Sequence, residues 1–77
     1  GPIAAFVNAL DNAGLKDFSL QNYAQHAISR GSAADAVSFV EIQRAEDNTA
    51  FWGASIDSNV ENGGLLALVS AYNRSRG

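Results

Sequence analysis

The spacing of apolar residues changes twice along this 77-residue chain, and that change limits which elements it can form. Near the N-terminus, apolar residues recur every three or four positions, which predicts a helix over residues 2–13. Apolar and polar residues then alternate in three runs, which predicts strands over residues 18–28, 36–43 and 50–56. Helical spacing returns over residues 65–72. The predicted order is therefore helix, three strands, helix.

Short turn-forming segments separate the predicted strands, at residues 29–32 and 46–48. Strands joined by turns this short pair antiparallel. The sequence therefore predicts an α+β fold in which two helices pack on one face of a three-stranded antiparallel sheet, with the open face or an edge left for a second chain. In the first strand, strict alternation places Leu20 on one face and Tyr23 and Ala27 on the other.

The size and composition of the chain favour association. A chain this short buries only about 60% of its unfolded surface, and it has no cysteine to add a disulfide. Eight acidic against five basic residues give a net charge of −3, which disfavours binding to a phosphate backbone. The sequence has neither an apolar run of about 20 residues nor the order of a signal peptide. We expect a soluble protein of the cytoplasm, or of an organelle matrix if the parent is eukaryotic.

An internal repeat connects the two predicted helices. Residues 1–10 align without gaps on residues 63–72, with four identical positions. Two Ala-rich amphipathic helices could also align this well without any duplication. If the duplication is real, the repeated unit is strands followed by a helix, and the strands of the first unit precede this chain.

Four segments carry a family resemblance, at residues 1–10, 23–28, 52–57 and 67–74. In their order and spacing they resemble the C-terminal regulatory domain of 2-isopropylmalate synthases, and the resemblance covers essentially the whole chain. It implies a domain of two strands-then-helix units that forms a homodimer and binds L-leucine near the dimer interface for feedback inhibition of leucine biosynthesis. Residues 1–77 would then be one regulatory domain that lacks the N-terminal strands of the family.

Two alternatives stay open beside this interpretation. The regulatory domain of citramalate synthase is similar and responds to isoleucine, although its motifs diverge more from these. The chain could also be a dimerisation module that binds no effector. In either regulatory interpretation the parent enzyme is an acetyl-CoA acyltransferase, a transferase, whose catalytic domain is the partner of this one, and we expect no catalytic residue, metal site or cofactor in these 77 residues.

The resemblance also implies which residues line the leucine pocket. They are apolar residues and one tyrosine, drawn from both ends of the chain and from two strands: Ile3, Ala4, Leu20, Tyr23, Ala27, Ala34, Ala36 and Val60. Alanines leave room for a branched side chain, and larger residues supply contact worth about 25 cal/mol per Å². The ligand's carboxylate would suit free N–H groups after Gly1-Pro2 or around Gly63-Gly64, and Asp57 is one candidate partner for its ammonium group. The alternative is that these residues are ordinary core.

Two positions depart from the family pattern. Gly63-Gly64 stands where the family usually has an Ala-Ser pair. Inside the last helix each glycine would cost about 1 kcal/mol, whereas before the helix the pair would mirror Gly1-Pro2. Ser55 stands where a glycine is common, which bears on how closely another backbone can approach that strand.

An enzymatic function would depend on His26, the only histidine, acting as a general base beside Asp57 or Glu41. The chain has no cysteine nucleophile and no serine in a nucleophile-elbow sequence. We therefore interpret His26 as a strand residue that packs against its neighbours or a dimer partner.

Overall fold

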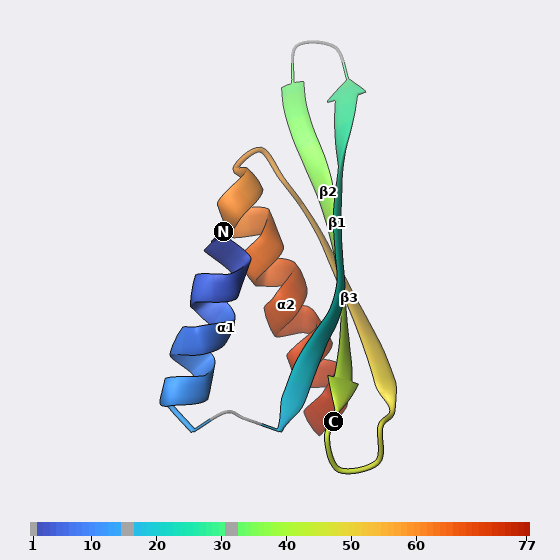
Figure 1. The fold of residues 1–77 in the computed structure, drawn as a ribbon. Coiled ribbons are helices and arrows are strands. Elements are labelled where there is room, and N and C mark those ends of the chain that lie inside the picture. The colour runs from blue at the N-terminus through green and yellow to red at the C-terminus, as the bar shows by residue number, and fades with distance from the viewer. Residues whose placement is uncertain (1, 15–16, 31–32) are drawn as a thin grey trace.

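A computed structural model describes residues 2–14, 17–30 and 33–77, with side chains described for residues 4–14, 17–28 and 35–77. It confirms the α+β class and the predicted order of elements (Figure 1). The elements are α1 (Pro2–Asn12), β1 (Phe18–Arg30), β2 (Ala33–Arg44), β3 (Ala50–Asp57) and α2 (Val60–Arg76). Apolar spacing thus located both helices and alternation located the three strands, and the structure extends the strands and the last helix at their ends.

The three strands form one antiparallel sheet in the order β1-β2-β3. β2 is central, and its pairing with β3 runs only from Ala36 to Gln43. The far end of the β1–β2 hairpin therefore projects beyond β3 (Figure 1). A β-bulge between Leu20 and Asn22 shifts the register of β1 against β2, so the side chains of β1 change faces at that point.

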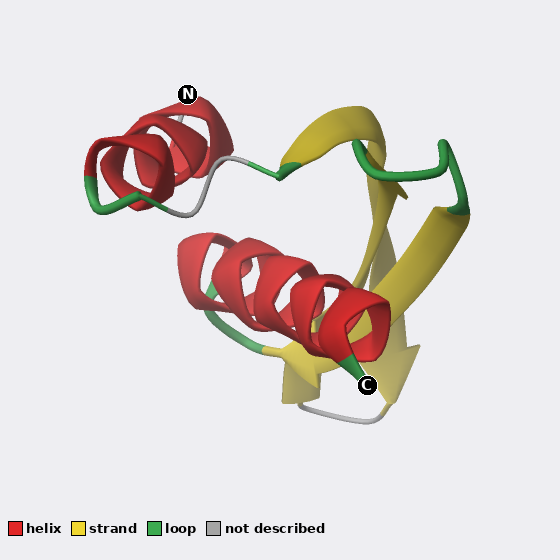
Figure 2. Cartoon of the chain, turned by 90° about the horizontal axis from the view of Figure 1, so that it is seen from below, coloured by secondary structure: helices red, strands yellow, loops and turns green. Residues whose placement is uncertain are grey.

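Both helices lie on one side of the sheet (Figures 1 and 2). α2 packs across β2 and β3, and α1 lies alongside α2. We call the sheet face that α2 covers the inner face and the opposite one the outer face. The fully buried apolar core lies between the inner face and α2, and its members are Val40, Ile42, Ala67, Leu68 and Ala71.

α2 begins earlier than the apolar spacing predicted. Asn59 caps it, because its side chain accepts the N–H of Asn62 at 3.0 Å. The N–H of Gly63 donates to the Asn59 carbonyl at 2.9 Å. Gly63 and Gly64 therefore lie inside the helix, both buried, and the alternative that they precede it is wrong.

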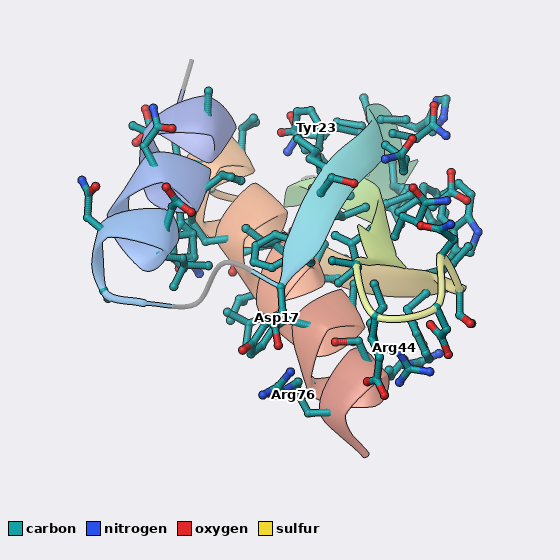
Figure 3. All side chains as sticks on the ribbon, turned by 60° about the horizontal axis from the view of Figure 1, so that its bottom comes forward. Asp17, Tyr23, Arg44 and Arg76 are labelled. Carbon is teal, nitrogen blue, oxygen red and sulfur yellow. The ribbon has the colours of Figure 1, made fainter. Side chains whose placement is uncertain are left out.

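The C-terminal end of α2 is tied to the sheet by charged and aromatic side chains (Figure 3). The Arg44 guanidinium donates to the Ser75 carbonyl at 2.7 Å and forms a bidentate pair with Asp47. Arg76 pairs with Asp17. These contacts satisfy a carbonyl and place cations where the helix dipole is negative.

The two repeated helices differ in how their matching faces are covered. Ala67 and Ala71 on α2 are fully buried, whereas the aligned Ala5 and Ala9 on α1 are exposed. Phe6 and Leu10 on α1 are half-buried against the core. Neither helix of the described residues is long and apolar enough to cross a membrane.

Candidate functional site

The start of α2 lies over an end of the inner face where small apolar residues meet a carboxylate. Ala27, Ala36 and Asp57 are direct neighbours in one row across the three strands. Opposite residues in such a row have Cβ atoms about 4.5–5.5 Å apart. Val60, the first residue of α2, follows Asp57 by three positions. The row therefore forms a short wall with a negative charge at its β3 end.

The next row, Gln25, Ser38 and Ser55, is polar and binds the sheet to α2. The Gln25 amide donates to the Ser38 hydroxyl at 2.7 Å and to the Val60 carbonyl at 2.8 Å. The Ser55 hydroxyl donates to the Gly63 carbonyl at 2.5 Å. Ser38 is fully buried, so this row fixes the height of the helix start above the sheet.

Tyr23 occupies the third row and lies against Gly64 on the helix side of β1 (Figure 3). A Cβ atom at Gly64 would stand 3.1 Å from the Tyr23 hydroxyl oxygen and 3.4 Å from the ring. Glycine at this position therefore leaves the space that the Tyr23 ring uses. Partial burial raises the pKa of Tyr23 above its ordinary value, and the hydroxyl, which is protonated at neutral pH as in any tyrosine, can donate a hydrogen bond.

Asp57 is held by the turn that leads into α2. One carboxylate oxygen accepts the N–H of Asn59 at 2.8 Å, and the other accepts the Asn62 amide at 2.7 Å. The backbone hydrogen bond from Asn59, followed by the bond from Asn62, lowers the pKa of Asp57. Asp57 is therefore an oriented anion at neutral pH, next to Ala36.

The structure brings four of the predicted pocket residues to this end of the inner face: Tyr23, Ala27, Ala36 and Val60. Leu20 lies on the same face but further along, where it packs against the buried core. Ala4 is exposed on α1. The side chains of Ile3 and Ala34 lie outside the described residues, as does Gly1.

Sequence reasoning missed the polar row, although Gln25 stands between two predicted pocket residues of the same strand, Tyr23 and Ala27. The expectation of free N–H groups around Gly63-Gly64 was wrong for Gly63, whose N–H is used within α2. The described residues enclose no pocket, so the candidate residues form one wall of a site.

His26 lies on the outer face, with its ring 6.2 Å from that of Phe39 in an edge-on arrangement. Asp57 is on the inner face, so the suggested pairing of His26 with Asp57 is wrong. Glu41 accepts a hydrogen bond from the Asn22 amide. Among the described side chains, no three histidine or acidic groups gather to hold a metal ion.

Comparison with known proteins identifies the domain type. The sequence profile of the LeuA allosteric (dimerisation) domain matches residues 1–76. The chain belongs to the LeuA allosteric domain family. This LeuA allosteric domain is 45% identical over 78 residues to a 2-isopropylmalate synthase of Bifidobacterium longum subsp. infantis, which covers 99% of the chain and 12% of that relative.

Two further relatives give the same result. The 2-isopropylmalate synthase of Schizosaccharomyces pombe is 40% identical over 75 residues, and that of Kineococcus radiotolerans is 44% identical over 75 residues. Each match covers 97% of the chain and 12% of the relative. The resemblance drawn from the sequence motifs is thereby confirmed, and the domain spans only about an eighth of each relative's length.

Proposed function

We infer that this LeuA allosteric domain is the regulatory part of a 2-isopropylmalate synthase and that it binds L-leucine as the feedback inhibitor. The observation that carries this proposal is the row of Ala27, Ala36 and Asp57 beside the start of α2. A free branched-chain amino acid has an aliphatic side chain and an ammonium group a few ångströms apart. The row offers an apolar wall and an anion at the same spacing.

Each part of leucine has a matching group in this arrangement. The isobutyl side chain would pack over Ala27 and Ala36, bounded by Tyr23 and Val60, and its burial would supply most of the affinity. The ammonium group would pair with the oriented Asp57 carboxylate, which has a lowered pKa. The carboxylate of leucine would face the first N–H groups of α2. These precede the N–H of Asn62, which the Asn59 side chain already accepts.

A second wall must cover the ligand, because one amino acid is held tightly only when most of its surface is buried. We propose that this wall comes from family strands that dock against α1, and that a second copy of the domain pairs with another face of the sheet. The exposed Ala5 and Ala9 on α1 match the sheet-facing Ala67 and Ala71 of α2. They would receive such strands as α2 receives β2 and β3.

Leucine bound at this wall would link β1 and β2 to the start of α2. A ligand shifts a conformational equilibrium only by its differential affinity for the two states. Binding would favour the state in which the hairpin and the start of α2 are close together. The linked catalytic domain would sense that state, so that inhibition is a coupling free energy between the two sites.

Thermal unfolding with millimolar L-leucine tests this proposal. A ligand that binds only the folded state raises stability by RT ln(1 + [L]/Kd), which is about 2.7 kcal/mol at a concentration of 100 Kd. We expect L-leucine to raise the midpoint, whereas L-isoleucine and D-leucine should raise it much less. A larger shift with L-isoleucine would transfer the proposal to a citramalate synthase.

A matched pair of variants locates the site. Ala36→Val fills the wall with two methyl groups, and Ala50→Val adds the same groups to a strand residue on the outer face. We expect Ala36→Val to abolish the shift with L-leucine and Ala50→Val to keep it. If the folded chain shows no shift with any of the amino acids, effector binding by this chain is wrong and a dimerisation module remains.

A further inference from the structure

The outer face of the sheet is an apolar surface that neither helix covers (Figures 1 and 2). Three large side chains on it are well exposed: Phe39 at 36%, Trp52 at 50% and Ile56 at 61%. Val37, Ala24 and Ala54 share this face, since they alternate with inner-face residues or pair with Phe39. Exposed apolar patches of this kind mark interaction sites.

The centre of the outer face places a large side chain between two small ones. Phe39 on the central strand has Ala24 on one side and Ala54 on the other, as direct cross-strand neighbours. On β3, Ala54 stands between the larger Trp52 and Ile56. A large ring thus lies next to two small side chains in the same surface.

The polar groups of this face border its apolar centre. Glu41 is the next residue of β2 after Phe39 that faces the outer side. Asn22 donates a hydrogen bond to its carboxylate. His26 places its ring edge-on to Phe39. An apolar centre with polar groups around it is the usual anatomy of a protein interface.

We propose that the outer face is the surface through which two copies of this domain pair, with Phe39 of each copy seated over the partner's Ala54 and Trp52 buried between them. This rests on the pairing part of the proposed function and not on leucine binding. A second copy fits because the large ring and the small side chains belong to the same surface, so one two-fold axis satisfies both at once. The family's description as a dimerisation domain agrees with that choice of partner.

Net charge also favours this face as the contact. Each copy carries a net charge of −3, so pairing must keep the acidic groups of the two copies apart. Phe39, Ala54, Trp52 and Ile56 bring no charge to the centre of the contact. Glu41, the cross-strand neighbour of Trp52, would lie at the rim, where Asn22 donates to its carboxylate. Alternating large and small residues across the interface would then give close packing without a buried unpaired charge.

Sedimentation velocity of the 77-residue chain over a dilution series, without leucine, tests the proposal. The tryptophan emission is measured on the same samples, because Trp52 is the only tryptophan. We expect a dimer whose emission moves to longer wavelength as dilution separates the copies. Phe39→Glu should raise the dissociation constant about 30-fold or more, as loss of a central contact does. The matched Leu66→Glu, at an exposed position of α2, should leave it unchanged.

A cross-link gives an independent measurement if Phe39→Glu fails to fold. The chain has no cysteine, so a mixture of Phe39→Cys and Ala54→Cys chains should form a disulfide-linked pair of one of each under mild oxidation. A dimer that persists in folded Phe39→Glu, or a dimer that forms no mixed disulfide, overturns this choice of face while leaving pairing intact. A monomer at all concentrations overturns both pairing and the face, and leucine binding stays testable by thermal shift.

Discussion

The backbone of Gly53 on β3 lies directly under Ala67 of α2: a Cβ atom at Gly53 would stand 2.1 Å from the Ala67 carbonyl oxygen. It would also stand 2.4 Å from the backbone nitrogen of Ala71. The helix thus rests on the strand with no side chain between their backbones. The contact is possible because Gly53 has no side chain and the facing helix residues, Ala67 and Ala71, have small ones.

Gly53→Ala is expected to destabilise the domain severely. The new methyl group meets backbone atoms that cannot move without lifting α2, so the cost should exceed the 1–3 kcal/mol of ordinary overpacking. In a domain this small, about 1 kcal/mol shifts the midpoint by roughly 4–8 °C. Thermal unfolding followed by circular dichroism should therefore show a midpoint lower by about 12 °C or more. Gly77→Ala, whose Cβ would make an ordinary 3.5 Å contact, should change the midpoint little.

The fold could be predicted from the sequence because its two periodicities are distinct. The alternation of β2 placed Val40 and Ile42 on one face, and the structure confirms it. On β3, the alternating set of Ala50, Trp52, Ala54 and Ile56 lies on the outer face, which the sequence alone did not reveal. The start of α2 could not be predicted from apolar spacing, because its first five residues include Asn62, Gly63 and Gly64. Only the cap at Asn59 marks that start, and the close approach to the sheet makes the glycines favourable there.

The candidate site was predicted only in part, and the bulge in β1 is the reason. Strict alternation separates Leu20 from Tyr23, yet both lie on the inner face, because the register shifts between Leu20 and Asn22. A bulge inserts one extra residue and reverses the faces after it. The family resemblance selected Tyr23, Ala27 and Ala36 despite the wrong alternation. It did not reveal that Asp57 is their neighbour, because that depends on strand register.

Gln25→Ala is expected to lower the free energy of unfolding by about 1–2 kcal/mol, because it removes two hydrogen bonds and leaves the buried Ser38 hydroxyl without its donor. Urea unfolding measures the change. Gln21→Ala is the matched control on the same strand, since its exposed amide donates to nearby Ser19, and it should stay within about 0.5 kcal/mol. Equal losses in the two variants would contradict a role for Gln25 in holding the start of α2.

Stability should fall as the pH drops below about 4, the ordinary range for aspartate. The hydrogen bond from Arg44, then the bond from Thr49, holds the pKa of Asp47 well below its usual value, and the Asn59 N–H lowers that of Asp57. The unfolded chain therefore binds protons first in acid, and stability present above pH 4 is lost as the pH falls toward the folded values.

Midpoints measured from pH 6 to pH 2 test this dependence. Asp47→Asn should be less stable than the unmodified chain near neutral pH and should approach it at low pH. Glu46→Gln removes a charge from the same exposed turn, where no described residue donates a hydrogen bond to the Glu46 side chain, so its curve should stay closer to that of the unmodified chain than the Asp47→Asn curve does. Parallel curves for Asp47→Asn would show that the Arg44 pair does not contribute to the acid sensitivity.

Gly64→Ala should separate stability from leucine binding. Alanine gains about 1 kcal/mol of helix propensity, which offsets the contact of its methyl group with Tyr23, so the midpoint should change by only a few degrees. The methyl group would lie 3.1 Å from the Tyr23 hydroxyl oxygen, so the half-exposed ring must swing away from the wall that we assign to leucine. We expect leucine affinity, measured by titration calorimetry, to fall about tenfold, which corresponds to about 1.4 kcal/mol.

Tyr23→Phe removes the atom in closest contact, so adding Gly64→Ala to Tyr23→Phe should cost less affinity than adding it to the unmodified chain. Equal costs in the two backgrounds would mean that Gly64 acts on the site by some route other than Tyr23.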